Sequence, residues 1–264
     1  MLKRRFLLIS IVYCLFSCVS YYSVPPTSKP ELGGSSILNY RIALVGFHPF
    51  STSTERTGQI VTVTAFLDYE RDFTDLMQIG KPVLDYPVIA QVPISTAEFQ
   101  KRLRPYLSRV RRTGVPEMEK IFDSGPRGHG IIFKKRAVDY YFVAVHGPPF
   151  GRCHEDIAAN LLSIMTFVTF PFRSICTSHT EILIMDSNFE QVGELNASTE
   201  TELSSAWWYY FLDSIPGVRE PMDAHALDRS LFRSDIYKLE AELLRIGVRG
   251  EPPIESEEYH DSQE

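Results

Sequence analysis

The stretches VDYYFVAVH, residues 138–146, and TEILIMD, residues 180–186, decide the fold predicted for this chain. Both are short runs rich in β-branched, aliphatic and aromatic residues, and Gly147-Pro148-Pro149 closes the first. Such runs, when turn residues bound them, are typical of β-strands. Ser187-Asn188 is a turn signal directly after the second run, so the chain is expected to continue into a further strand at 189–195.

Further strands are predicted on either side of this pair. Alternation of Val and Thr favours a half-exposed strand at 60–67, and flanking prolines favour an edge strand at 86–92. Two more extended runs lie at 40–47 and 131–133.

Four helices complete the predicted elements. The first begins at Ser95, where Ser95-Thr96-Ala97-Glu98 has the spacing of a capping box, and runs to Arg112. Pro105 lies inside it and is expected to kink or split it. The other three are predicted at 155–168, 199–212 and 223–246. Strands and helices in mixed order indicate a single α+β domain over residues 40–249, with an antiparallel or mixed sheet covered by helices.

Composition bounds the function classes. The chain has 264 residues, 44% of them hydrophobic, and a formal charge of −6. A disordered or low-complexity chain is excluded, and a protein that wraps nucleic acid would usually be basic. Four cysteines are too few for a disulfide scaffold.

The N-terminus has the pattern of a signal peptide. Lys3, Arg4 and Arg5 precede an apolar run, Phe6–Phe16, that only Ser10 interrupts. This run is much shorter than the roughly 20 residues that span a bilayer. Residues 1–17 are therefore expected to be a signal peptide, whose removal would leave a more acidic protein.

Leu15-Phe16-Ser17-Cys18 resembles the lipobox of bacterial lipoproteins, in the permissive form of spirochaetes. The resemblance implies cleavage before Cys18 and acylation of its sulfur and new amine, with palmitate-like chains that attach the protein permanently to a membrane. Phe16 departs from the small or β-branched residue usual in the family. Two alternatives remain, which are ordinary cleavage after Ser20 and retention of the segment as an anchor.

The regions beside the predicted domain have simple compositions. Residues 18–39, rich in Pro, Gly and Ser, are expected to form a tether without regular structure, and residues 250–264 an acidic disordered tail. From residue 138 onward the pattern of strand, Thr-rich apolar segment, hairpin and Trp-rich stretch loosely resembles envelope lipoproteins of unknown function.

Two cysteines remain in the body, Cys153 and Cys176. An oxidising envelope would permit a disulfide between them, but no spacing rule favours it over two separate thiols. Cys153-His154-Glu155-Asp156 contains metal-ligand types without a metal-binding spacing, so no metal and no cofactor are expected. No catalytic motif is present, and the chain is predicted not to be an enzyme.

Two apolar segments have competing interpretations. Residues 161–172 favour a core helix over an interfacial or oligomer contact, because Thr166 and Thr169 interrupt a segment too short to cross a membrane. The second segment is aromatic, and its neighbours cannot all face inward on one helix, so it is a candidate contact patch: Trp207, Trp208, Tyr209, Tyr210 and Phe211.

The helix predicted after Ser95 carries a cluster of cationic residues on one face. A solvated helix face is the ordinary interpretation, and pairing with the protein's own acids is a further one. In an acidic surface protein the cluster is also a candidate contact for a polyanion. Its members are Lys101, Arg102, Arg104, Arg109, Arg111 and Arg112.

These observations predict a lipid-anchored protein of the cell envelope, in the outer membrane, that acts as a non-enzymatic binding module for other macromolecules. Its expected partners are the membrane, through the N-terminal lipid, and a protein or polyanion, but not nucleic acid. The alternative is an assembly component that oligomerises through its apolar segments, and an envelope hydrolase is a lesser alternative.

Overall fold

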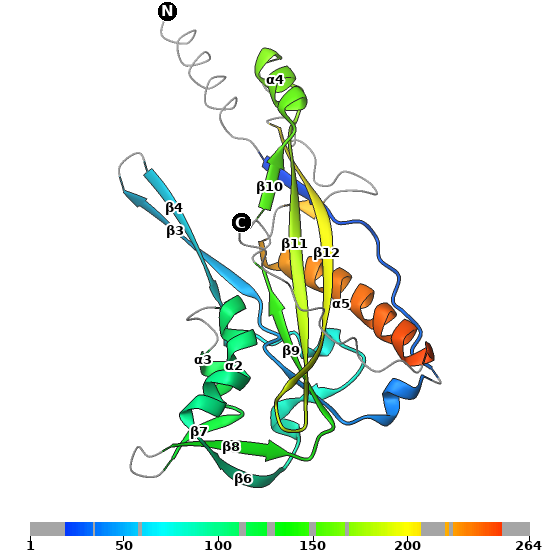
Figure 1. The fold of residues 1–264 in the computed structure, drawn as a ribbon. Coiled ribbons are helices and arrows are strands. Elements are labelled where there is room, and N and C mark those ends of the chain that lie inside the picture. The colour runs from blue at the N-terminus through cyan, green and yellow to red at the C-terminus, as the bar shows by residue number, and fades with distance from the viewer. Residues whose placement is uncertain are drawn as a thin grey trace, which may run out of the picture. The chain divides into compact units, whose positions relative to one another are not determined.

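The computed structural model describes residues 19–33, 35–57, 60–110, 115–125, 130–147, 152–166, 169–206, 220–221 and 224–249. The fold is a single α+β domain with a mixed sheet, which confirms the predicted class (Figure 1). The chain packs as two compact units. Unit 1 takes residues 1–26, 148–178 and 198–232, and unit 2 takes 27–147, 179–197 and 233–264.

Unit 2 is built around the two stretches that decide the fold. β9 (Tyr140–His146) pairs antiparallel with residues 180–186 of β11 (Phe172–Asp186) and parallel with β2 (Ile42–Val45). β2 also pairs with the short β5 (Lys81–Pro82). The strand β12 (Gln191–Ala206) follows β11 after a turn at 187–190.

The rest of unit 2 surrounds this core. A three-stranded sheet has the order β6 (Val88–Ile94), β8 (Ile131–Arg136), β7 (Phe122–Ser124), so the prediction of an edge strand after Tyr86 is confirmed. A hairpin of β3 (Phe50–Thr57) and β4 (Ile60–Leu67) forms a two-stranded sheet of its own. Short helical turns are η1 (Ser36–Asn39), η2 (Thr74–Leu76), η3 (Val83–Asp85) and α3 (Val115–Met118).

Helix α2 (Thr96–Val110) packs over an aromatic core. Leu103 and Tyr106 are buried against β8, β9 and β11, in a cluster that includes Phe122, Phe133 and Phe189. The capping box is confirmed, because the Ser95 hydroxyl accepts from the Glu98 N–H while the Glu98 carboxylate accepts from the Ser95 N–H. The helix continues through Pro105, so the predicted split does not occur.

Unit 1 contains the first residues of β11, the last residues of β12, and the strands that pair with them. β1 (Val19–Ser23) pairs antiparallel with β12 and with β13 (Glu220–Pro221). β10 (Arg152–Glu155) pairs with residues 174–177 of β11, and α4 (Ile157–Met165) joins the two strands. Helix α5 (Ala224–Arg249) confirms the predicted amphipathic helix and contributes Leu227 and Leu231 to this core, against Tyr22.

Two sequence predictions are wrong here. The tether predicted at 18–39 is structured within the described residues, because β1 belongs to the sheet and Tyr22, Leu32 and Ile37 are buried. The helix predicted at 199–212 is replaced, up to Ala206, by strand β12. Side chains from Leu195 to Thr201 alternate between buried and exposed, which is the two-residue period of a strand. Residues 250–264 lie outside the described residues.

Candidate functional site

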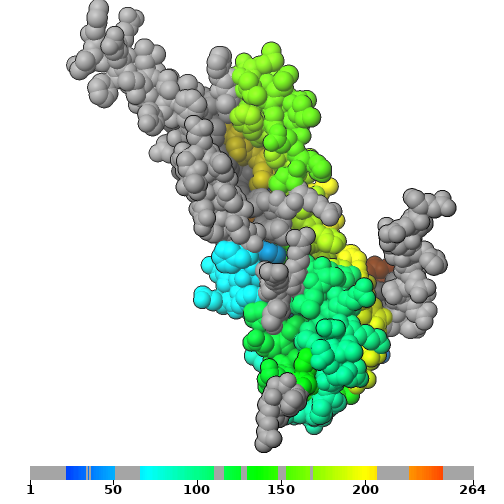
Figure 2. All heavy atoms as spheres, turned by 60° about the vertical axis from the view of Figure 1, so that its left-hand side comes forward, coloured from blue at the N-terminus to red at the C-terminus, as the bar shows by residue number. Residues whose placement is uncertain are grey.

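Helix α4 of unit 1 exposes its large apolar side chains. Ile157 is 78% exposed, Met165 71%, Ile164 64% and Leu161 60%. The expectation of a core helix is therefore wrong. Figure 2 shows the yellow-green atoms of α4 at the surface of the molecule. Soluble proteins rarely expose contiguous apolar surface, and where they do it marks a contact with a protein, a ligand or a membrane.

The side of α4 that faces the protein is small instead of apolar. Its buried residues are Ala159 and Ser163, one helical turn apart. Asn160 lies beside them, and its side-chain oxygen accepts from the backbone N–H of Arg173 at 2.9 Å. The usual arrangement of an amphipathic helix is thus inverted, with bulky apolar residues outside and small or polar ones inside.

Both ends of α4 have hydrogen-bond partners. The Asp156 carboxylate caps the first turn by accepting from the N–H of Ala159 at 3.0 Å, and the Asp156 N–H donates to the carbonyl of Arg173. At the other end the Thr166 hydroxyl donates to the carbonyl of Leu162 at 2.8 Å. The helix is therefore a defined element in which the exposed residues hold fixed positions.

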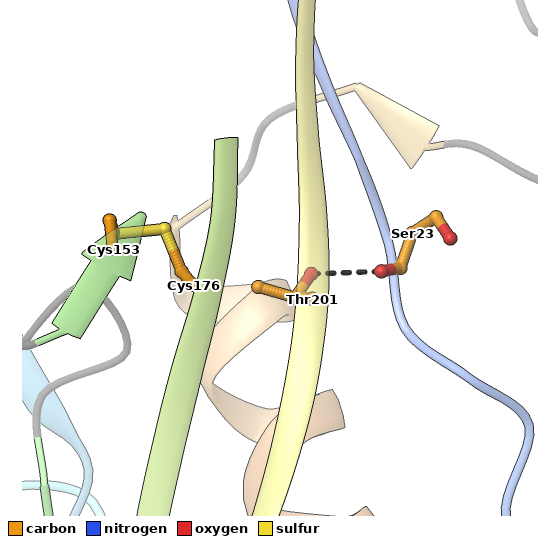
Figure 3. The surroundings of a disulfide bond; sticks show 4 residues. All are labelled: Ser23, Cys153, Cys176 and Thr201. Atoms are coloured by element: carbon orange, nitrogen blue, oxygen red, sulfur yellow. Dashed lines mark hydrogen bonds between the residues drawn. A yellow bond between two sulfur atoms is a disulfide. The ribbon is translucent and has the colours of Figure 1, made fainter. Parts of the chain in front are cut away.

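A disulfide ties the base of α4 together. Cys153 of β10 and Cys176 of β11 face each other in the strand register and are bonded (Figure 3). Of the two arrangements that the sequence left open, the structure has the bridge. Cys176 is fully buried, and the two cysteines lie 23 positions apart in the sequence, with all of α4 between them.

The next strands of unit 1 are also tied together. The Thr201 hydroxyl on β12 donates to the carbonyl of Ser23 at the end of β1, at 2.9 Å (Figure 3). Arg173 of β11 lies 3.5 Å from the Glu202 carboxylate of β12. Cross-strand links therefore run from β10 through β11 and β12 to β1.

The basic face of α2 is divided instead of continuous. Lys101 and Arg104 are exposed, but the guanidinium of Arg102 lies over the Phe133 ring at 5.4 Å from its centre. Arg109 forms ion pairs with Glu181 and, at 2.5 Å, with Glu194. Arg111 and Arg112 lie outside the described residues. Arg109 thus follows the interpretation in which the cations pair with the protein's own acids.

Glu181 and Glu194 share the Arg109 guanidinium and bond to each other. Burial and the hydrogen bond with Glu194 raise the pKa of Glu181 to about 7, against the pull of Arg109. Burial opposes ionisation of Glu194 too, but its hydrogen bonds with Asn196 and Glu181 and the charge of Arg109 lower the pKa of that carboxyl. The pair therefore holds one proton close to neutral pH.

A second buried ionic cluster of unit 2 joins His48, Glu117 and Lys120. Glu117 binds the His48 ring and the Lys120 ammonium, the latter at 2.7 Å, and accepts from the Gly46 N–H at 3.1 Å. Burial alone would lower the pKa of His48, but the hydrogen bond and charge of Glu117 outweigh it and the pKa is raised. The pair of His48 and Glu117 is not predicted by the sequence, because its members lie 69 residues apart without any motif.

A third cluster contains the residue types of a hydrolytic site. The Thr180 hydroxyl donates to Asp235 at 2.8 Å and lies 2.7 Å from Nδ1 of His146. Because this hydroxyl gives its proton to the carboxylate, the imidazole is not placed as its base. All three residues are buried. The adjacent cavity, lined by His48, His146 and other residues of unit 2, has a volume of about 10 Å³, which is the room of one water molecule.

Within the described residues, no three His, Cys, Asp or Glu side chains are arranged to hold a metal ion. In the same part of the chain, no helix has the length and apolar character needed to span a bilayer. Cys18 and the aromatic patch at Trp207, Trp208, Tyr209 and Tyr210 lie outside the described residues, so both stay predictions.

Comparison with known proteins adds no relative: the chain matches no protein-family model, no curated protein and no solved structure. The candidate site with the best structural support is therefore α4 on its disulfide-linked base. Its residues lie in a segment that was predicted to be a core helix, whereas the structure exposes them. The signal that this prediction passed over is the small, partly polar stripe of Ala159, Asn160 and Ser163 opposite the large apolar residues.

Proposed function

We propose that this chain is a lipid-anchored protein of the cell envelope, held by acyl chains on Cys18, and that it acts as a non-enzymatic contact module. The observation that carries the proposal is the exposed apolar face of α4, fixed on a base that the Cys153–Cys176 disulfide closes. A fixed apolar surface of this kind is used for binding.

The disulfide supports an envelope location. Such bonds form and persist in oxidising compartments and are rare where glutathione keeps thiols reduced. The bond lies in the same chain as the charged and apolar residues that resemble a lipoprotein signal. These two features are independent, because one is a contact between strands and the other is a pattern in the first 18 residues.

The chemistry of α4 supports contact over catalysis. The exposed side chains of the helix are Ile, Leu, Met and Ala, which can neither donate nor accept a proton. In unit 2, Glu117 and Glu181 are ion-paired with cationic side chains of the protein itself. Contact with another macromolecule or with lipid is the role that such a helix can perform.

The anchor is tested with Cys18→Ala in the full chain, expressed in a bacterium that processes lipoproteins. Cys14→Ala is the matched control, because Cys14 lies in the same N-terminal region but outside the lipobox. Mass spectrometry of the wild-type N-terminus should find fatty acids on Cys18. The Cys18→Ala protein should lose them and accumulate as precursor or as protein cut after Ser20, whereas Cys14→Ala should be processed normally. An N-terminus without fatty acid in the wild-type protein would refute the anchor.

Alkylation of the intact protein gives a second test of the location. Cys153 and Cys176 should react only after reduction when the protein comes from the envelope of its host. Free thiols at both positions would place the native chain in a reducing compartment and contradict the proposal.

A further inference from the structure

We infer that the partner of α4 is the lipid bilayer itself, and that the outer face of the helix inserts into the membrane interface beside the N-terminal anchor. The statement about the anchor rests on the proposed function. The statement about α4 rests on its own exposed side chains and can be tested separately.

The segment that contains α4 is uncharged and apolar on its outer face. Residues 157–172 contain no Asp, Glu, Lys or Arg. Ile157, Leu161, Ile164 and Met165 follow the spacing of one helix face, and all four are exposed. An uncharged apolar surface can be buried among lipid acyl chains, whereas a protein interface usually has a polar rim around its apolar centre.

The length of α4 suits the membrane interface and not a crossing of the bilayer. α4 has nine residues, a length of about 14 Å at 1.5 Å per residue. The hydrocarbon core of a bilayer is about 30 Å thick, so the helix cannot cross it. Interfacial helices bury an apolar face only about 5–10 Å below the headgroups, which a single helix of this size achieves. A stable protein interface takes about 20–30 residues on each side, more than α4 offers.

The residues that follow α4 place an aromatic ring beside a cationic side chain. Phe170 follows α4, and the Arg173 guanidinium lies 6.0 Å from the centre of its ring. Arg173 is half-buried and next to Glu202. A long cationic side chain can reach lipid phosphate while its stem stays against apolar groups, and Phe is among the residues that interfacial segments bury.

The N-terminal strand enters unit 1 at the end that carries α4. Val19, the first described residue, pairs with Ala206 at the end of β12. β12 returns antiparallel beside β11, with Ser178 bonded to Thr199 and Arg173 beside Glu202. The end of β12 therefore lies level with the start of β11, which directly follows α4. Acyl chains on Cys18 would leave unit 1 from the end that carries the apolar helix.

The experiment uses photocrosslinking in the full chain. Leu161→p-benzoylphenylalanine places the probe on α4, and Leu84→p-benzoylphenylalanine is the matched control on η3. The two leucines are 60% and 62% exposed, so the probe replaces the same side chain at the same accessibility. Each protein is reconstituted into phosphatidylethanolamine–phosphatidylglycerol vesicles that contain a phospholipid with an alkyne on its acyl chain, irradiated, and assayed for lipid adducts.

We expect at least ten-fold more lipid adduct at position 161 than at position 84. Equal labelling at the two positions would overturn the inference. A crosslinked product of twice the chain mass at position 161 would overturn it in favour of self-association, and a product with another protein in native membranes would overturn it in favour of a protein partner. Both probes replace exposed side chains, so thermal melting within 2 °C of wild type should confirm that each variant is folded.

The two proposals fail in different ways. Lipid adducts at position 161 in a chain whose Cys18 carries no fatty acid would remove the anchor and keep the membrane contact of α4. Fatty acid on Cys18 without adducts at position 161 would keep the anchor and remove the contact.

Discussion

Breaking the disulfide below α4 should destabilise the protein by an amount that follows from the length of the loop. Cys153→Ala removes the cross-link but leaves the Cys176 thiol at its buried site, where a free cysteine behaves as a small apolar residue. For a sequence separation of 23, the chain-entropy model gives about 11 cal/mol/K, or about 3.4 kcal/mol at 25 °C. At roughly 2–4 °C per kcal/mol, the melting temperature should fall by about 7–14 °C.

The assay is thermal and urea unfolding followed by circular dichroism, with and without reductant. The wild-type protein should lose the same stability when it is reduced, and Cys153→Ala should not respond to reductant. His154→Ala is the control, because it changes the next exposed residue of β10 and should shift stability by less than about 0.5 kcal/mol. A shift below 2 °C for both the reduced wild type and Cys153→Ala would refute the reasoning, since the open loop would then be as well ordered as the closed one.

Two further predictions concern unit 2. Gly46 has φ +79°, and a Cβ there would lie 2.6 Å from the carbonyl oxygen of Ala144, so Gly46→Ala should destabilise the protein by about 2–3 kcal/mol in urea unfolding. Gly33→Ala is the control and should be nearly neutral, because a Cβ at Gly33 would have nothing within 4 Å. Similar urea midpoints for the two variants would contradict the packing at Gly46. The pKa of Glu181, about 7 in the folded protein, exceeds its ordinary value of 4.5, so the folded state binds the proton more tightly and stability should fall as pH rises from 4.5 to 7. We expect a loss on the order of 1 kcal/mol, because partial solvent access and the lowered pKa of Glu194 both reduce it. Glu181→Gln should lessen the fall of the urea midpoint between pH 4.5 and 6.5, below the range in which the raised pKa of His48 adds a loss of its own. An equal slope in wild type and Glu181→Gln would assign the pH dependence to other groups.

The features that sequence predicted correctly are those whose cause is local. β9 and the second half of β11 are short apolar runs, rich in β-branched residues and bounded by turn residues, which is the pattern typical of strands. The capping box at Ser95 and Glu98 needs only four consecutive residues. These elements were sufficient to fix the α+β class, because strands and helices in mixed order admit few packing arrangements.

The features that sequence missed depend on partners far along the chain. β1 is stabilised by its pairing with residues 202–206 of β12. Its own short Tyr-containing sequence, next to a Pro-rich stretch, does not predict a strand. The bond of Cys153 with Cys176 was left open beside two separate thiols for the same reason, because it requires the β10–β11 register. α4 was wrongly predicted to be buried because apolar content predicts burial only on average. The composition of a helix does not identify the surface against which it packs.

The orientation of α4 follows from hydrogen bonds that hold its rotation. Asn160 accepts from the N–H of Arg173, and the N–H of Asp156 donates to the carbonyl of the same residue, so the first turn is attached to both backbone polar groups of one residue of β11. Rotating the helix to bury Leu161 would break these bonds and leave polar backbone groups without partners, each at a cost of about 1–3 kcal/mol. It would also replace Ala159 and Ser163 by side chains too large for the space that they occupy. The folded protein therefore presents the apolar face of α4 before any partner arrives. The proposed insertion into a bilayer would then require no rearrangement of the helix, and its affinity would not be reduced by a conformational step.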